Sequence, residues 1–289
     1  MYFAFYVVAL CAYLLLSAYL FIRGWQALPE STIFRVLYSV IFLFFTSSLL
    51  IGFFFKNWFS FRVINFFKTV EGFWILFFLF FMFSALLADL LRILHYYFHI
   101  FPEPVIKNWQ TVKQCYFYSV VAVLIIITLT GFYKFAHPRM KDLTLILNKK
   151  TDKIQDLKIV AVSDVHIGNI VGQKRLAKWI KIINEQNPDL ILITGDLFDQ
   201  NFDTSKSEII SKELAKMKAR YGIYAILGNH EYYTNTEKAI ECMHRAGIEL
   251  LRDESEVIDN RLVIIGRDDA TNLQRKYLSL LLTDIDTTL

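Results

Sequence analysis

Three short polar segments, each directly after an apolar run, contain the residues of this 289-residue sequence that could do chemistry. The segments are Ser163-Asp164-Val165-His166, Gly195-Asp196-Leu197-Phe198-Asp199 and Gly228-Asn229-His230-Glu231. Together they offer carboxylates, one amide and two imidazoles, and none of them contains a cysteine. Mixed nitrogen and oxygen donors of this kind suit Mn, Fe, Zn or Ni rather than a soft metal. The residue types therefore indicate a divalent-metal site built from three loops.

The elements that must position these loops alternate along the chain. Strand-like apolar runs precede the three segments, and helical patterns follow them. The runs are Leu157–Val162, Leu190–Ile193 and Ile223–Leu227, and the helical patterns lie at about Lys174–Glu185, Glu208–Lys218 and Asn235–Ala246. Such alternation predicts an α/β architecture with a buried, largely parallel sheet. Because ligand sites in these sheets lie at the carboxyl ends of the strands, we expect the three loops to meet there.

Each motif taken alone has a simpler interpretation. A polar residue at a strand end often serves only to satisfy backbone groups in a turn, and an Asp-x-His triplet arises often by chance. Three such motifs in order, each directly after an apolar strand, favour one metal site over three unrelated turns.

The motifs D-x-H, G-D-x-x-D and G-N-H-E resemble the calcineurin-like metallophosphoesterase superfamily over about residues 157–289. The apolar segments before them resemble a membrane-anchored bacterial branch of that family. The resemblance implies a β-sandwich flanked by helices that houses two divalent metals a few ångströms apart. It also implies a role for each motif residue: Asp164 and His166 bind the first metal, Asp196 bridges both, Asn229 binds the second, His230 acts on the phosphate, and Asp199 and Glu231 orient ligands.

The chemistry implied by two adjacent cations is hydrolysis of a phosphoester. The metals lower the pKa of a bridging water and neutralise charge on the phosphoryl oxygens during in-line attack. His230 would serve as a transition-state donor or leaving-group acid. The expected substrate is a phosphomonoester, a phosphodiester or a lipid-linked phosphoester.

Composition divides the chain near residue 135. Of 27 Phe residues, 25 lie at or before Phe135, and residues 1–135 contain 9 Lys/Arg and 4 Asp/Glu, against 22 and 23 in the remainder. The net charges are therefore 9 − 4 = +5 and 22 − 23 = −1. A soluble part with net charge −1 and no basic stripe argues against a nucleic-acid partner. The expected domains are a transmembrane region over 1–135, a connector with a first hairpin over 136–156, and the phosphoesterase domain over 157–289. In that hairpin Leu143–Leu147 pairs with Leu157–Val162.

Four apolar stretches are long enough to span a hydrocarbon core, which takes roughly 20 helical residues. They lie at about 1–22, 36–55, 72–91 and 115–135. Four spans put both ends of the region on one side, which collects eight Lys/Arg against five on the other. The positive-inside rule then predicts an inner-membrane protein with a cytoplasmic soluble domain. Asp89 with Arg92, and His95 with His99, share helix faces. The histidine pair could hold a metal or haem, but a polar helix end at the interface is the favoured interpretation.

The resemblance stops before the end of the family pattern. A later histidine and a G-H-x-H loop are expected after G-N-H-E, but after His230 only His244 follows. We therefore expect a C-terminally truncated sequence whose metal site lacks some protein ligands. The alternative function is a catalytically impaired pseudoenzyme that acts as a membrane-bound binding protein.

Overall fold

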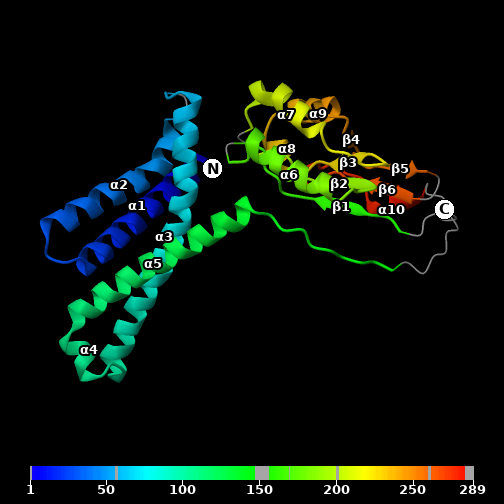
Figure 1. Cartoon of the computed structure of the whole chain (residues 1–289). Helices are drawn as coiled ribbons and strands as arrows, with labels where there is room; N and C mark the ends of the chain where they lie inside the picture. Colours follow the sequence, from blue (N-terminus) through cyan, green and yellow to red (C-terminus); the bar gives the residue numbers. More distant parts are fainter. Residues whose placement is uncertain are drawn as a thin grey trace. The chain divides into compact units, whose positions relative to one another are not determined.

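The computed structural model describes residues 2–55, 58–146, 156–168, 170–199, 202–259 and 262–283. The chain forms two compact units, Met1–His137 and Pro138–Leu289. The first unit is helical, and the second combines helices with strands (Figure 1).

The helical unit consists of α1 (Tyr2–Ala27), α2 (Thr32–Phe54), α3 (Phe61–Phe98), the short α4 (Glu103–Lys107) and α5 (Trp109–Ala136). All except α4 are long and apolar enough to cross a membrane. The prediction of four apolar helices is confirmed. However, α3 has 38 residues and extends well beyond the expected span of 72–91. Polar residues such as Lys68 and Asp89 mark where an apolar stretch ends, but they do not interrupt helical hydrogen bonding, so the helix continues through them.

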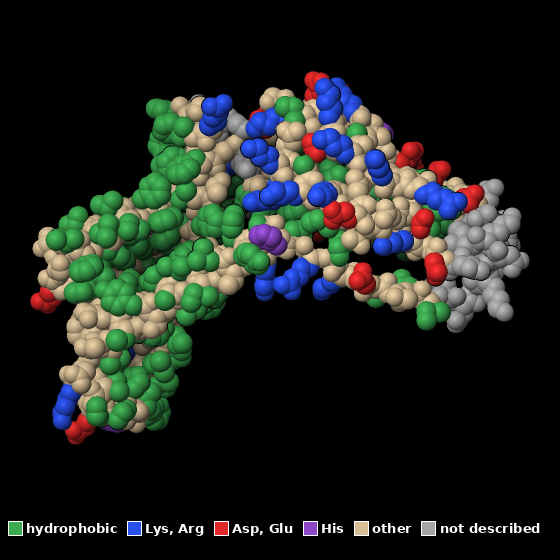
Figure 2. Space-filling model, in the orientation of Figure 1, with side chains coloured by type: hydrophobic (Ala, Val, Ile, Leu, Met, Phe, Trp, Pro, Cys, Tyr) green, Lys and Arg blue, Asp and Glu red, His purple; other side chains and the backbone are tan. Residues whose placement is uncertain are grey.

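Apolar side chains face outward in this unit, and small polar groups lie between its helices. Leu15 and Phe83 are each 72% exposed, whereas Ser48 is fully buried. The helical part of the surface is accordingly covered with hydrophobic side chains in Figure 2. Between the helices, Trp74 donates a hydrogen bond to the Tyr13 hydroxyl over 2.8 Å. This arrangement suits a helical bundle whose surroundings are apolar.

The second unit is built on a four-stranded parallel sheet of order β1-β2-β3-β4. Its strands are β1 (Ile159–Val162), β2 (Leu190–Thr194), β3 (Ile223–Ile226) and β4 (Glu249–Leu250), and β5 (Glu254–Ile258) pairs antiparallel with β6 (Leu262–Gly266). Its helices are α6 (Gln173–Glu185), η1 (Thr204–Lys206), α7 (Ser207–Leu214), α8 (Asn229–Tyr233), α9 (Thr236–Arg245) and α10 (Leu278–Thr283). The predicted α/β fold with a parallel sheet is confirmed.

The core of this unit surrounds the central strand β2. Leu190 and Ile191 are both fully buried, so this strand is covered on both faces. The helix α6 presents Leu176, Ile180 and Ile183 to the same core, at the spacing of one helical face. Burial on both sides of the sheet holds the strand ends in register, and the loops after β1, β2 and β3 begin from that fixed base.

One local expectation is wrong. Residues 143–146 form no strand, and Leu143 and Ile146 are 80% and 87% exposed, because the part of the chain that the structure describes offers them no strand partner. The rest of the expected hairpin, 147–155, lies outside the described residues. The helix α9 begins after Asn235, whose side chain accepts a hydrogen bond from the Lys238 N–H. Thr234 ends the preceding helix α8.

Candidate metal centre

The three motif loops lie side by side at the carboxyl ends of β1, β2 and β3. The loops after β1 and β2 are joined by their backbones: His166 N–H donates to the Asp196 carbonyl over 3.0 Å, and Ile167 N–H donates to the Leu197 carbonyl over 2.8 Å. Asp199 N–H returns a bond of 3.0 Å to the Ile167 carbonyl. The sheet thus extends into these loops by a short ladder, which fixes the separation of their side chains.

His166, Asp196 and His230 converge in the structure. One ligand atom from each lies within 4.8 Å of the other two, and all three side chains are half-buried. The imidazole rings of His166 and His230 are 4.5 Å apart at an angle of 75°. A divalent ion binds histidine and carboxylate donors at about 2.0–2.2 Å, so three donors this close could share one ion. The donor set and its spacing therefore fit a metal.

Asp164 and Asn229 lie at the margin of this group. The Oδ1 atom of Asp164 is 3.8 Å from Nε2 of His166, but its side chain is 67% exposed, and Ser163 Oγ donates to its other oxygen. The Asn229 amide lies 3.1 and 3.3 Å from the two carboxylate oxygens of Asp196. Asn229 can donate its N–H to Asp196, or it can turn its oxygen to share a cation with that carboxylate. The structure thus places Asn229 against Asp196 and leaves Asp164 facing solvent.

Asp199 lies beside His230 rather than among the converging donors. Its Oδ1 atom is 3.4 Å from Nδ1 of His230, a nitrogen that is buried and makes no hydrogen bond among the described residues. At 3.4 Å the two groups interact as a charge and a polar ring rather than through a well-formed hydrogen bond. A small rotation of either side chain would bring the two atoms within hydrogen-bond distance.

Glu231 is fully buried and binds backbone rather than any donor of the group. It accepts hydrogen bonds from the N–H groups of Gly228 (2.8 Å), Asp196 (3.1 Å) and Phe198 (2.7 Å). Burial raises the pKa of its carboxyl group, and these three N–H donors oppose the rise. Because its partners lie on two loops, Glu231 ties the segment after β2 to the segment after β3.

Backbone conformation at the site is unusual. Asp164, His166 and Asp196 have φ angles of 54°, 50° and 52°, in the left-handed region that few non-glycine residues adopt. A Cβ on Gly228 would collide with the Asp196 carboxylate, and one on Gly195 would lie 3.0 Å from the Gly228 nitrogen. Strained residues of this kind concentrate at functional sites. The two glycines are needed because the loops approach each other too closely for a side chain.

Two further residues near the site were not singled out from the sequence. Gly168 approaches Asp199 so closely that a Cβ there would be 3.0 Å from the aspartate Cβ. The ring of Tyr233 is 6.0 Å from that of His230, and this tyrosine is 60% exposed, so it could contact a bound substrate. Their signals are weak: a glycine two positions after His166, and an aromatic residue that follows G-N-H-E.

The histidine pair in the helical unit differs from this centre. His95 accepts a hydrogen bond from Phe101 N–H over 3.1 Å, and His99 ends α3 in the left-handed conformation. Within the described ranges, no third histidine, cysteine or carboxylate lies close enough to these two histidines to bind a metal ion with them. His95 and His99 thus shape the end of a helix, the favoured interpretation from the sequence.

Comparison with known proteins agrees with the motifs. Residues 157–274 match the model of the calcineurin-like phosphoesterase family. The chain is 30% identical over 179 residues to a transmembrane protein with metallophosphoesterase domain from Danio rerio, covering 58% of this chain and 40% of that protein. It is 32% identical over 132 residues to an uncharacterized metallophosphoesterase from Aquifex aeolicus (strain VF5), covering 46% of this chain and 50% of that protein.

A metallophosphoesterase of Helicobacter pylori (strain J99), also uncharacterized, is 32% identical over 134 residues, which cover 42% of this chain and 35% of that protein. The chain thus spans half or less of the length of these relatives. No solved structure shows significant similarity. The family resemblance seen in the motifs is confirmed over residues 157–274, which match a family that uses divalent metals. Among the residues that the structure describes, four helices are long and apolar enough to cross a membrane.

Proposed function

We propose that this protein is a membrane-anchored, metal-dependent hydrolase of phosphoesters. The observation that supports it is the convergence of His166, Asp196 and His230 within 4.8 Å at the carboxyl ends of three parallel strands. The family match over residues 157–274 supports the same chemistry. Activity therefore belongs to the α/β unit, and the helical unit serves as its anchor.

Two divalent metals, drawn from Mn, Fe, Zn and Ni, are proposed at this centre. Asp164 and His166 would hold the first, Asp196 would contact both, and Asn229 would contribute its amide oxygen to the second. Oxygen and imidazole donors suit these metals, and the amide of Asn229 already lies against the oxygens of Asp196. When bound, such metals supply a water of lowered pKa and positive charge to stabilise the phosphoryl oxygens.

The side chains have separate tasks in the proposed reaction. His230 donates a proton to the oxygen of the leaving group, and Asp199, 3.4 Å from its Nδ1, holds the ring in orientation. Glu231 keeps the loops after β2 and β3 together through the backbone bonds to Gly228, Asp196 and Phe198. Its role is positional, because its carboxylate is already occupied by three N–H donors.

A lipid-linked phosphoester is the proposed substrate class. Asp164 follows His137 by 27 positions. A fully extended chain of that length reaches about 90 Å, which sets an upper limit on the distance between the site and the end of α5. The charge count of the loops supports an inner-membrane location with the α/β unit in the cytoplasm.

The full-length protein in detergent, supplied with Mn²⁺, provides the test. Three substrates are compared: a nitrophenyl phosphomonoester, a nitrophenyl phosphodiester and a prenyl monophosphate in mixed micelles. We expect hydrolysis of at least one, lost on chelation and restored by Mn²⁺. For a lipid substrate, the rate should fall when the micelle surface is diluted with detergent at constant bulk concentration.

Elemental analysis of the same preparation separates the competing outcomes. Bound metal without hydrolysis of any substrate would contradict the enzyme and favour a binding protein. Absence of bound metal would contradict the metal centre itself. Glu241→Gln removes the charge of a half-exposed carboxylate on α9 that pairs with Lys238 and Arg245; it is the matched control and should keep full activity.

A further inference from the structure

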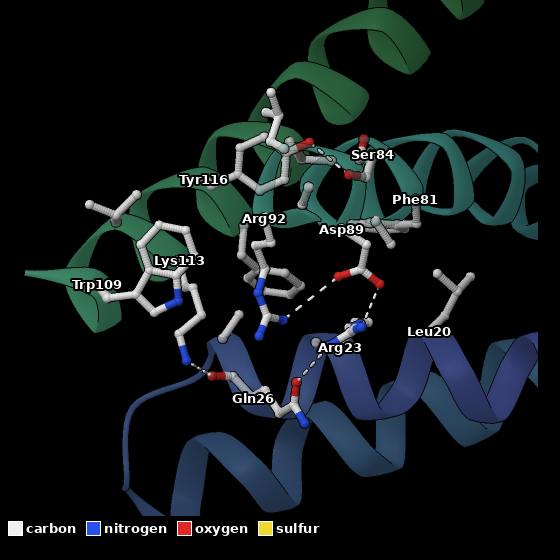
Figure 3. Close-up of a pocket in the computed structure, with 18 of the residues that line it drawn as sticks. Leu20, Arg23, Gln26, Phe81, Ser84, Asp89, Arg92, Trp109, Lys113 and Tyr116 are labelled. Atoms are coloured by element: carbon white, nitrogen blue, oxygen red, sulfur yellow. Dashed lines mark hydrogen bonds and ion pairs between the residues drawn. The ribbon is translucent and has the colours of Figure 1, made fainter. Parts of the chain in front are cut away.

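A cavity of about 270 Å³ lies within the helical unit, between α1, α2, α3 and α5 (Figure 3). Most of its wall is hydrophobic, with Leu20, Trp74, Phe81 and Phe117 among the lining residues. A wall of this kind is suited to hydrocarbon. The few charged side chains that line the cavity come from α1, α3 and α5. The cavity therefore has a charged part and an apolar part.

The charged part of the cavity has an excess of positive charge. Arg23 of α1, Arg92 of α3 and Lys113 of α5 line it, and Asp89 is the one carboxylate among the lining residues that the structure describes. Three cations against one anion leave a net charge of 3 − 1 = +2. In Figure 3 Arg23 of α1 and Arg92 of α3 approach Asp89, and Lys113 of α5 extends toward Gln26 of α1.

The three cations differ in how closely they are paired with an anion or a hydrogen-bond acceptor. Arg23 forms a close ion pair with Asp89, which also accepts a hydrogen bond of 2.8 Å from Tyr19. Arg92 approaches Asp89 only to 3.7 Å and is half-exposed, and Lys113 donates a long bond of 3.4 Å to the Gln26 carbonyl. Asp89 therefore balances Arg23, and Arg92 and Lys113 have capacity for a further anion.

These charges lie near one end of the bundle. Arg23 is four residues from the end of α1, Arg92 is six from the end of α3, and Lys113 is four from the start of α5. At 1.5 Å per residue, these intervals correspond to about 6–9 Å from the helix ends. That depth is the level of lipid headgroups, and the bundle end is the opposite one from His137. A pocket with net positive charge at this level attracts anionic headgroups.

We propose that this cavity binds one anionic phospholipid, with its phosphate between Arg92 and Lys113 and an acyl chain along the apolar wall. A free phosphate ion would satisfy the cations but leave the wall of Leu20, Trp74 and Phe81 unfilled. A zwitterionic lipid would fill the wall but bring its own positive charge toward two cations. The ligand that satisfies both parts is an amphiphile with net negative charge. This site is independent of the metal centre.

Native mass spectrometry of the full-length protein in a neutral detergent tests the proposal. The protein is titrated with phosphatidylglycerol and with phosphatidylcholine of the same acyl chains, so that only the headgroup charge differs. We expect phosphatidylglycerol to bind at least about tenfold more tightly. Equal affinity for the two lipids would overturn the proposal. So would displacement of bound phosphatidylglycerol by millimolar inorganic phosphate, because the chain would then contribute nothing.

Variants locate the site. The double substitution Arg92→Gln with Lys113→Gln should bring the two affinities within about twofold of each other. Lys134→Gln removes one positive charge from the exposed last turn of α5, outside the cavity, and should retain the preference. An equal loss in Lys134→Gln would overturn the proposal, since general surface charge would then explain the selectivity.

A second variant tests the apolar part without changing any charge. Ala88→Phe places a ring in the cavity from α3. It should abolish the tight binding of phosphatidylglycerol, and size-exclusion chromatography shows whether the protein remains folded. Undiminished tight binding in a folded Ala88→Phe protein would overturn the assignment of the acyl chain to this cavity.

Discussion

The two units differ in where their large apolar side chains lie. In the α/β unit, Leu190 of the central strand is fully buried, whereas Leu15 of the helical unit is 72% exposed. Ser48, a small hydroxyl residue, is fully buried in the helical unit and donates to the Phe45 carbonyl over 2.6 Å. Many large apolar side chains thus lie on the outer surface of the helical unit, whereas those of the α/β unit gather in its core, because one unit folds against water and the other against an apolar medium.

Buried charge is also handled differently in the two units. In the α/β unit, the fully buried Glu231 accepts hydrogen bonds from three backbone N–H groups and so holds two loops together. In the helical unit, Asp89 is partly exposed and meets arginine side chains around a cavity. Backbone donors are fixed in place, whereas long basic side chains can rearrange. The first arrangement suits a rigid reaction site, and the second suits a ligand that enters and leaves.

A carboxylate-to-amide substitution should change the rate of hydrolysis strongly in the α/β unit and not in the helical unit, and this is the largest expected difference between the two. Asp196→Asn removes the one carboxylate among the three converging donors. The rate of hydrolysis should therefore fall at least about 100-fold, as expected when a direct metal ligand is lost rather than a residue that only contacts a ligand. Glu103→Gln, the same change at an exposed residue of α4, should leave the rate unchanged. Steady-state assays with elemental analysis measure both effects. Unchanged activity in Asp196→Asn would remove this residue from the proposed metal centre.

Loss of the buried carboxylate should produce the largest change in stability. Glu231→Ala leaves three backbone N–H groups without their acceptor and should lower the free energy of unfolding of the α/β unit by about 3–5 kcal/mol. Ser48→Ala in the helical unit removes one hydroxyl bond and should cost about 1 kcal/mol. Hydrogen exchange followed by mass spectrometry resolves the two units. A loss below 1 kcal/mol for Glu231→Ala would show that water replaces its oxygens.

Truncating a leucine in each unit tests directly whether leucine is buried in the α/β unit and faces outward in the helical unit. Leu190→Ala creates a cavity beside fully buried Ile191 and should destabilise the α/β unit by about 3 kcal/mol. Leu15→Ala, on the outer surface of α1, should change the stability of the helical unit in detergent by less than about 0.5 kcal/mol. Exchange rates of β2 and α1 amides report each effect. Equal losses would mean that Leu15 packs against protein rather than lipid or detergent.

A smaller, pH-dependent effect is expected at Asp268, which is 3% exposed. Burial alone would raise the pKa of this carboxyl group, but hydrogen bonds from Tyr232 and Asn272 and the charge of Arg252 bring it below its ordinary value. A lowered pKa in the folded state stabilises the fold above the ordinary aspartate pKa of about 3.9. That stability is lost as the pH falls through the folded-state pKa.

Asp268→Asn should therefore be less stable than the parent by about 2 kcal/mol near neutral pH. The difference should shrink as the pH falls below about 3.9. Hydrogen exchange of β6 cannot be compared across such a range without correction for intrinsic rates, so urea unfolding at fixed pH values is the better measurement. A difference that is constant with pH would show that packing, rather than the charge, accounts for the role of Asp268.

Much of the architecture could be predicted from the sequence, because the pattern that fixes it is local. The four apolar helices and the parallel sheet follow from the length and alternation of apolar runs. The convergence of the loops after β1, β2 and β3 follows from the parallel order of the strands. The length of α3 could not be predicted from hydropathy, which detects apolar stretches and not the end of hydrogen bonding. The absence of a strand at 143–146 depends on a partner, which the segment itself does not reveal.

Details of the site depend on contacts that the motifs do not encode. The motif gives Asp164 and Asp196 the same chemistry, yet the first is exposed and the second lies among the converging donors. The difference arises from the loop backbones, whose hydrogen bonds draw Asp196 toward the loop of Glu231. The cavity between α1, α2, α3 and α5 was likewise beyond prediction, since it requires knowing which helix faces meet.

The left-handed conformation of Asp164, His166 and Asp196 has a consequence for protein engineering. Each of these residues holds a backbone shape that glycine would adopt at lower cost, by roughly 1 kcal/mol. A screen that rewards heat resistance alone would therefore enrich glycine at these three positions. The selected proteins would be more heat-resistant but would lack the side chains that the proposed metal site needs. A library built on this scaffold must therefore be selected for turnover and thermal tolerance together.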